Sequence, residues 1–148
     1  MGLFDQVLGT RQSTSISFNP AEAFAAIALI AIASDGHFSG EEVDLINTSL
    51  RRMQLFKSYP TDVLQRMYDK LFGILRRDGI PVLLASAKAS LPFELRESAF
   101  AIATDLILSD GTVTPEEESF LNDLCHALDI NSAIAMKIVE VMLIKNRG

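Results

Sequence analysis

A nine-residue phrase occurs twice in this chain, 75 residues apart, and each copy follows a long apolar stretch. Both copies, residues 34–42 and 109–117, contain in order Ser-Asp-Gly, an apolar residue, a hydroxyl residue and Glu-Glu. The similarity extends outward, because residues 22–46 and 97–121 are identical at 10 of 25 positions. Since neither copy alone can bury its apolar helix, the repeat predicts two helical hairpins packed about a pseudo-twofold axis.

Apolar residues recur along the chain at the three-to-four spacing of an α-helix, and no useful stretch alternates as a strand does. Asn19 before Pro20 is a typical helix start, whereas Tyr59-Pro60 and Asp78-Gly79 are typical helix breaks. We expect helices at residues 20–33, 39–55, 61–75, 81–89, 92–108, 115–128 and 132–144. The predicted fold class is all-α, a compact bundle of about seven helices with an internal duplication.

At 148 residues the chain is long enough for a single domain with a real core. We divide it into repeat 1 at residues 20–55, a connector at 56–91, repeat 2 at 92–128 and a C-terminal helix at 131–146. The net charge of −6 is unevenly distributed: residues 51–96 hold nine Lys and Arg against four acids, and residues 97–148 hold three against nine. The acidic excess argues against nucleic acid as a partner.

The apolar run at residues 23–33 is bracketed by Glu22 and Asp35, so it is shorter than the roughly 20 residues that cross a bilayer. We interpret it as a buried helix and expect no transmembrane segment. A lone Cys125 forms no internal disulfide, and the N-terminus lacks the basic segment and apolar core of a signal peptide, which predicts a cytoplasmic protein. The amphipathic residues 3–8 either lie on a membrane surface or, as we expect, dock on the body of the fold.

The hydroxyl and Glu residues of the repeated phrase have a purely structural explanation. Ser39 with Glu42, and Thr114 with Glu117, match S/T-x-x-E, the capping box that satisfies free backbone N–H groups at a helix start. The glycine of each copy can adopt the positive φ with which helices often end. Capping explains the Asp of each copy less well, because an acid at a helix C-terminus opposes the helix dipole.

Those two aspartates, Asp35 and Asp110, suggest a cation site. The pattern Asp-Gly-x-apolar-x-x-x-Glu matches the later part of an EF-hand loop, although the earlier loop carboxylates are missing. If the two long helices pack antiparallel, Glu22 approaches Asp110 and Glu97 approaches Asp35. The predicted ligands form two sites, which are Asp35, Glu42 and Glu97 in one and Asp110, Glu117 and Glu22 in the other. Additional candidates are Glu41, Glu116 and Asp105.

The sequence offers little support for other chemistry. Cys125 and His126 are adjacent, but neighbours on a helix point about 100° apart and zinc needs further ligands. We therefore expect Cys125 to be a small core residue. The chain has no Gly-rich phosphate loop and no plausible Ser/His/Asp set, so we expect a protein that is not an enzyme.

The duplicated Asp-Gly-x-apolar-[Ser/Thr]-x-Glu-Glu hairpin, the Glu-led apolar helix before it and the Met-Gly-Leu-Phe-Asp start resemble the TerB-like family associated with tellurite resistance. The resemblance extends from Phe18 to Arg147. It implies a compact all-helical domain with an acidic surface and metal binding, in bacterial stress-response systems that act near the inner membrane. The acidic set that it implies is Asp35, Glu42, Asp110, Glu117, Glu22 and Glu97.

Two functions are open at this point. The first is a non-enzymatic module that binds a divalent cation, Ca²⁺ or Zn²⁺, in tellurite resistance or bacterial stress response. The alternative is a protein-interaction scaffold whose acidic motif residues are helix caps and a binding face. Either function implies an unidentified protein partner, with membrane-associated stress-response components as candidates, and a homo-oligomer is compatible with both.

Overall fold

The computed structural model describes residues 17–33, 40–109 and 111–147, and these ranges are helical with no strand. They contain six α-helices and one 3-10 helix, which confirms the all-α class, whereas the internal duplication stays a prediction. The elements in order are α2 (Pro20–Ala33), α3 (Gly40–Arg51), η1 (Gln54–Phe56), α4 (Thr61–Ser90), α5 (Phe93–Ile107), α6 (Pro115–Ala127) and α7 (Ser132–Lys145).

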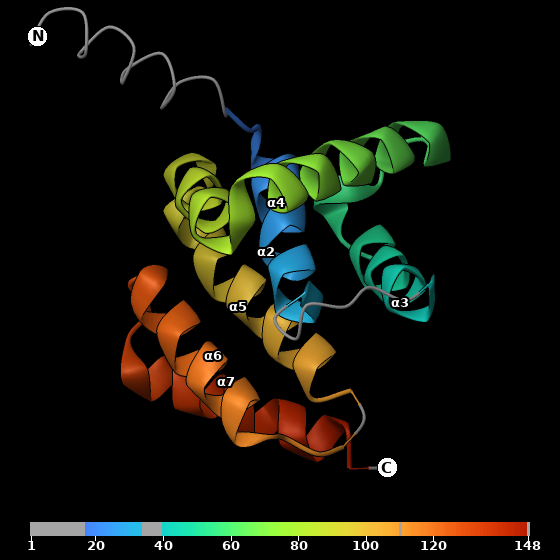
Figure 1. Ribbon diagram of the computed structural model, residues 1–148. Coiled ribbons are helices and arrows are strands. Elements are labelled where there is room, and N and C mark those ends of the chain that lie inside the picture. Colours follow the sequence, from blue (N-terminus) through green and yellow to red (C-terminus); the bar gives the residue numbers. More distant parts are fainter. Residues whose placement is uncertain (1–16, 34–39, 110, 148) are drawn as a thin grey trace, which may run out of the picture.

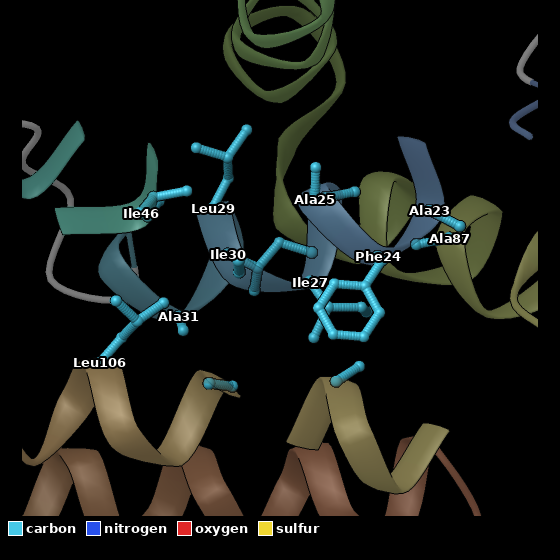
Figure 2. Packing of buried hydrophobic residues seen from close by; sticks show 14 of the residues in the cluster. Ala23, Phe24, Ala25, Ile27, Leu29, Ile30, Ala31, Ile46, Ala87 and Leu106 are labelled. Carbon is cyan, nitrogen blue, oxygen red and sulfur yellow. The ribbon is translucent and has the colours of Figure 1, made fainter. Parts of the chain in front are cut away.

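Helix α2 is the centre of the fold, with α4 and α5 packed along it (Figure 1). Every residue from Ala23 to Ala33 is buried. The labelled side chains of α2 in Figure 2 point to several sides, so the helix has no solvent-facing side. This is the burial that a helix with apolar residues around its whole circumference requires, and the many alanines let neighbouring helices approach closely.

Helix α3 ends earlier than the sequence predicts. The helix expected to reach Leu55 ends at Arg51, and the extended backbone of Met53 leads into the 3-10 helix η1. This change of direction brings Phe56 into the core, where its ring packs edge-on against Phe24 with centroids 6.2 Å apart. The predicted continuous helix is therefore wrong, because burying one aromatic ring outweighs prolonging the helix.

Helix α4 connects the two repeats and is bent at Gly79. Gly79 has φ 86° and ψ 172°, values outside the helical region, and Pro81 follows it. The sequence predicts a turn at Asp78-Gly79 between separate helices, and the structure has the break at that glycine with helix continuing on both sides. Since the connector folds back on itself, the start of α5 returns to the same end of the molecule as the start of α2 (Figure 1).

Helix α5 consequently runs in the same direction as α2. Ala31, near the end of α2, lies against Leu106, near the end of α5 (Figure 2). The antiparallel packing expected from the sequence is therefore wrong.

Helices α6 and α7 lie on the side of α5 that faces away from α2 (Figure 1). Asn131 caps α7, as expected, by accepting a hydrogen bond from the Ala133 N–H at 2.8 Å. None of the helices in the described ranges has the length and apolar character needed to span a bilayer.

Candidate functional site

Glu22, a predicted metal ligand, caps the start of α2. Its Oε1 accepts a hydrogen bond from the Asn19 N–H at 3.1 Å, and Asn19 Oδ1 accepts one from the Glu22 N–H at 2.8 Å. Glu22 Oε2 lies 2.8 Å from Lys70 Nζ on α4. The same ammonium lies 5.5 Å from the centre of the Phe18 ring. Glu22 therefore fixes the entry of the chain into α2, and Lys70 already balances its charge.

Glu117 has the corresponding structural role at α6. Thr114 Oγ1 accepts a hydrogen bond from the Glu117 N–H at 3.1 Å, and Glu117 Oε1 accepts one from the Thr114 N–H at 2.9 Å. Pro115 stands in the first helical turn, where no N–H is needed. Gly111 has φ 82°, the positive value predicted for the turn before the helix. The capping interpretation of this copy is confirmed.

The other four predicted ligands are not seen together among the residues that the structure describes. Asp35 and Asp110 lie outside the described residues, and the side chain of Glu42 is not described either. Glu97 is exposed in the first half of α5. Because α2 and α5 are parallel, Glu97 and Glu22 both lie toward the end of the helix pair opposite to the end from which the repeated turns leave.

Parallel helices remove the reason for pairing Glu22 with Asp110 and Glu97 with Asp35. Ile32 is ten residues beyond Glu22, about 15 Å along the helix at 1.5 Å per residue. The approach of Glu22 to Asp110, and of Glu97 to Asp35, depended on antiparallel helices and loses its basis. Among the residues that the structure describes, no three His, Cys, Asp or Glu side chains could hold a metal ion together. Metal binding by the six carboxylates stays a prediction.

Asp105, considered as an additional ligand, attaches α7 to α5. Its Oδ1 accepts hydrogen bonds from Lys145 Nζ at 3.1 Å and from Asn146 Nδ2 at 2.8 Å. Asn146 Nδ2 also donates to the carbonyl oxygen of Met142 at 3.0 Å. These contacts hold the C-terminal end of α7 in place beside α5.

An open apolar groove of about 640 Å³ lies between α6 and α7, with α5 as its floor. Both helices pack on α5, and the space between them is not filled by side chains. The apolar lining comes from all three helices and includes Phe100, Leu108, Leu121, Cys125, Val139 and Leu143. A concave, mostly apolar surface of this size is typical of a binding site.

Carboxylates stand on both walls of the groove. Glu118 projects from α6 and Glu140 from α7, and both are exposed. Asn122 and His126 add polar groups on the α6 wall. An apolar floor between two acidic rims complements a ligand that is apolar on one side and positively charged at its edges.

Cys125 lines the groove without being reactive. Its side chain is buried, its Sγ donates to the carbonyl oxygen of Ile130 at 3.4 Å, and burial raises the pKa of the thiol. A thiol in apolar surroundings is a poor nucleophile because the thiolate is the reactive form. The prediction that Cys125 is a small core residue is confirmed.

Helix α7 exposes more large apolar side chains than any other helix in the described ranges. Its only buried residue is Ala135. Met136 is 65% exposed, Val141 57% and Ile144 61%, and Ile134 and Leu143 are also exposed. The sequence carried a signal for this surface, since apolar residues surround α7 and a helix at the end of the fold cannot bury all of them against one neighbour.

Comparisons with protein-family models, with curated proteins and with solved structures find no match to this chain. The resemblance to the TerB-like family therefore stays a prediction. The functional argument rests on the groove and on the exposed apolar residues of α7.

Proposed function

We propose that this chain is a non-enzymatic protein-interaction module and that the groove between α6 and α7 is its docking site for an amphipathic helix. The observation that carries the proposal is a groove with an apolar floor and acidic rims. The two predicted ligand glutamates whose contacts are described both serve as helix caps, which favours the scaffold function over the cation function.

The dimensions of the groove fit a helix of two to three turns. Its lining runs from Glu118 to His126 on α6 and from Ser132 to Leu143 on α7, so the groove is about 12–17 Å long at 1.5 Å per residue. Amphipathic helices dock in such grooves through apolar anchors at i, i+3, i+4 and i+7. Lysine or arginine beside the anchors would lie near Glu118 and Glu140.

Fluorescence anisotropy with two labelled model helices of about 14 residues, the length of α7, tests this function. One peptide has leucines on one side and lysines at the edges, and the other has glutamates in place of the lysines. We expect the lysine peptide to bind roughly tenfold more tightly or better, a difference of about 1.4 kcal/mol. Equal binding of both peptides would reject the role of the acidic rims, and binding of neither would reject the docking site.

A matched pair of variants locates the binding. Met136→Lys places a cation in the groove at a residue that is 65% exposed, so the fold should survive. Val82→Lys makes the same change on α4, outside the groove, at a residue that is 40% exposed. We expect Met136→Lys to weaken the lysine peptide roughly tenfold, as loss of an interface anchor does, and Val82→Lys to leave it unchanged. Equal effects would show that the peptide binds elsewhere.

The divalent-cation function in tellurite resistance has its own test. Isothermal titration of the parent protein with Ca²⁺, Zn²⁺ and Mg²⁺ is compared with the variant Asp35→Asn/Asp110→Asn. A ligand that binds only the folded state raises the melting temperature in a saturable way, and the variant should lose that rise. Absence of heat and of a melting shift in the parent would remove this function and leave the groove proposal intact.

A further inference from the structure

Helix α7 has two apolar sides that the fold leaves uncovered. Met136 and Leu143 line the groove, whereas Ile134, Val141 and Ile144 lie outside it. At 100° per residue, Val141 points about 160° away from Leu143. We call the first side the groove side and the second, made of Ile134, Val141 and Ile144, the outer side. One helix therefore borders an empty apolar groove and also presents an apolar surface of its own.

The outer side of α7 has the chemistry that the groove requires. It is apolar at three positions spread over most of the helix, and the exposed Lys137 lies between them. The groove offers an apolar floor with Glu118 on one wall and Glu140 on the other. Length also agrees, because α7 has 14 residues and the facing wall α6 has 13.

We propose that the occupant of the groove is α7 of a second copy of this chain, seated reciprocally in a twofold dimer. The inference rests on the proposed function, since it needs a groove that accepts a helix. A twofold arrangement closes on itself, because the same surface serves both partners. The groove sides of the two α7 helices meet at the axis, and the outer side of each packs against α6 of the other copy.

The reciprocal dimer explains the open groove and the exposed apolar sides of α7 together, whereas a single copy explains neither. It fills the groove, and it covers both the groove side and the outer side of α7. It also places Lys137 of each copy beside Glu118 on α6 of the other, where opposite charges fix the register. Interfaces between identical subunits are typically apolar at their centre, as this surface is.

The chain's own amphipathic start is the less suitable occupant. Residues 3–8 contain Asp5 and no Lys or Arg, so their charge opposes the acidic rim. They would also leave the outer side of α7 uncovered.

Sedimentation velocity and light scattering of the full chain over a range of concentrations test the dimer. We expect a mass of twice the 16.2 kDa of one chain. Ile144→Asp, on the outer side, should give the single-chain mass, and Met136→Lys, on the groove side, should do the same. Val82→Asp, at an exposed apolar residue of α4, is the control and should stay dimeric. Melting curves establish that each variant is folded.

Charge reversal tests the register. Lys137→Glu should weaken the dimer roughly tenfold, and Glu118→Lys in the same chain should restore much of the loss, because the swapped pair attracts again. Restoration by Glu118→Lys distinguishes a direct pair across the interface from a general effect of net charge. A double variant as weak as Lys137→Glu alone would contradict this register.

A labelled peptide of residues 131–147 separates the failure of this inference from the failure of the proposed function. The peptide should bind the folded Ile144→Asp monomer, whose own groove is intact, and should bind Met136→Lys roughly tenfold more weakly. A wild-type chain that is monomeric at all concentrations would overturn the dimer, as would a dimer that survives both variants. Lysine-peptide binding by such a monomer would keep the docking function, and binding only after deletion of residues 1–12 would identify that segment as the occupant.

Discussion

Helices α2 and α7 each have 14 residues and both are strongly apolar, yet their surroundings are opposite. Twelve residues of α2 are buried, and one residue of α7 is. The difference arises because α2 is enclosed by α4, α5 and α3, whereas α7 packs on α5 alone along most of its length. The apolar composition of a helix therefore determines how much surface should be buried. The arrangement of the neighbouring helices determines how much of that surface is buried.

The contrast has a functional consequence. An apolar helix whose burial is complete contributes to stability and offers no contact to another molecule. An apolar helix that is half covered and borders an acidic-rimmed groove offers a recognition surface. Within the described residues, the fully buried helix α2 and the candidate binding surface thus lie on opposite sides of α5.

The largest expected effect comes from making one substitution in both helices. Ile30→Ala in α2, at a fully buried side chain, should lower the free energy of unfolding by about 2–5 kcal/mol, because a cavity remains. Ile144→Ala in α7 should change it by less than about 0.5 kcal/mol. Urea unfolding measures both, at a protein concentration where the midpoint does not depend on concentration. Similar losses of unfolding free energy for the two variants would contradict the difference in burial between α2 and α7.

A second effect concerns Tyr68 on α4, the helix that covers α2. Burial raises the pKa of Tyr68 to about 12, partly opposed by the charge of Arg51, and the hydroxyl donates to Asn47 Oδ1 at 3.3 Å. Because the folded pKa exceeds the usual value of about 10, this group stabilises the fold below pH 10, and the contribution is lost as the pH rises through 12.

The alkaline loss attributable to Tyr68 is on the order of 2–3 kcal/mol. Tyr68→Phe should therefore lose less stability than the parent between pH 10 and 12, at the cost of one hydrogen bond at neutral pH. Unfolding by urea at a series of pH values measures the difference. Parallel stability curves for parent and variant would show that the ring is accessible to solvent and that the cover over α2 is loose.

The stability cost of removing a helix cap should not depend on how deeply the helix is buried. Asn19→Ala at α2 and Thr114→Ala at α6 each remove a side chain that accepts a backbone N–H. Each should cost about 1 kcal/mol, since a cap acts locally whether its helix is central or peripheral. Thermal unfolding checks this. A loss with Asn19→Ala alone would mean that the start of α6 opens independently of the rest of the fold.

The smallest effect is expected at Asp129, which joins α6 to α7. The hydrogen bond and charge of Lys88, with a smaller contribution from Arg96, lower the pKa of this exposed carboxyl. Asp129 therefore stabilises the fold above its usual pKa, and this contribution disappears as the pH falls through the lowered value. Asp129→Asn, which tolerates the φ of 56° at this residue, should melt slightly below the parent at pH 7, and the difference should shrink as the pH falls through the lowered pKa. A difference that does not change with pH would have a cause other than charge.

The sequence located most helix boundaries closely. Asn19 and Pro20 predicted the start of α2, Thr114 and Pro115 that of α6, and Asn131 that of α7. These signals are reliable because a cap acts on N–H groups two or three residues away and depends on little else. The prediction failed after Arg51, where the long-range contact of two phenylalanine rings set the local structure.

The candidate site was less predictable than the helices. The sequence singled out carboxylates, and the contacts of Glu22 and Glu117 are those of helix caps. It described α7 as one more helix and gave no indication of a groove, because a groove depends on how far two helices diverge on a third. Only the excess of apolar residues around α7 signalled an unfilled surface.

The sequence by itself determined that this protein is all-helical, where most of its helices begin and how much apolar surface each must bury, because these properties follow from interactions between residues three or four positions apart. Only the tertiary structure decided that α2 and α5 are parallel, that Glu22 pairs with Lys70 and that α7 remains half exposed. Helix direction and coverage depend on the bent connector α4 and on packing between distant segments, which no local pattern records.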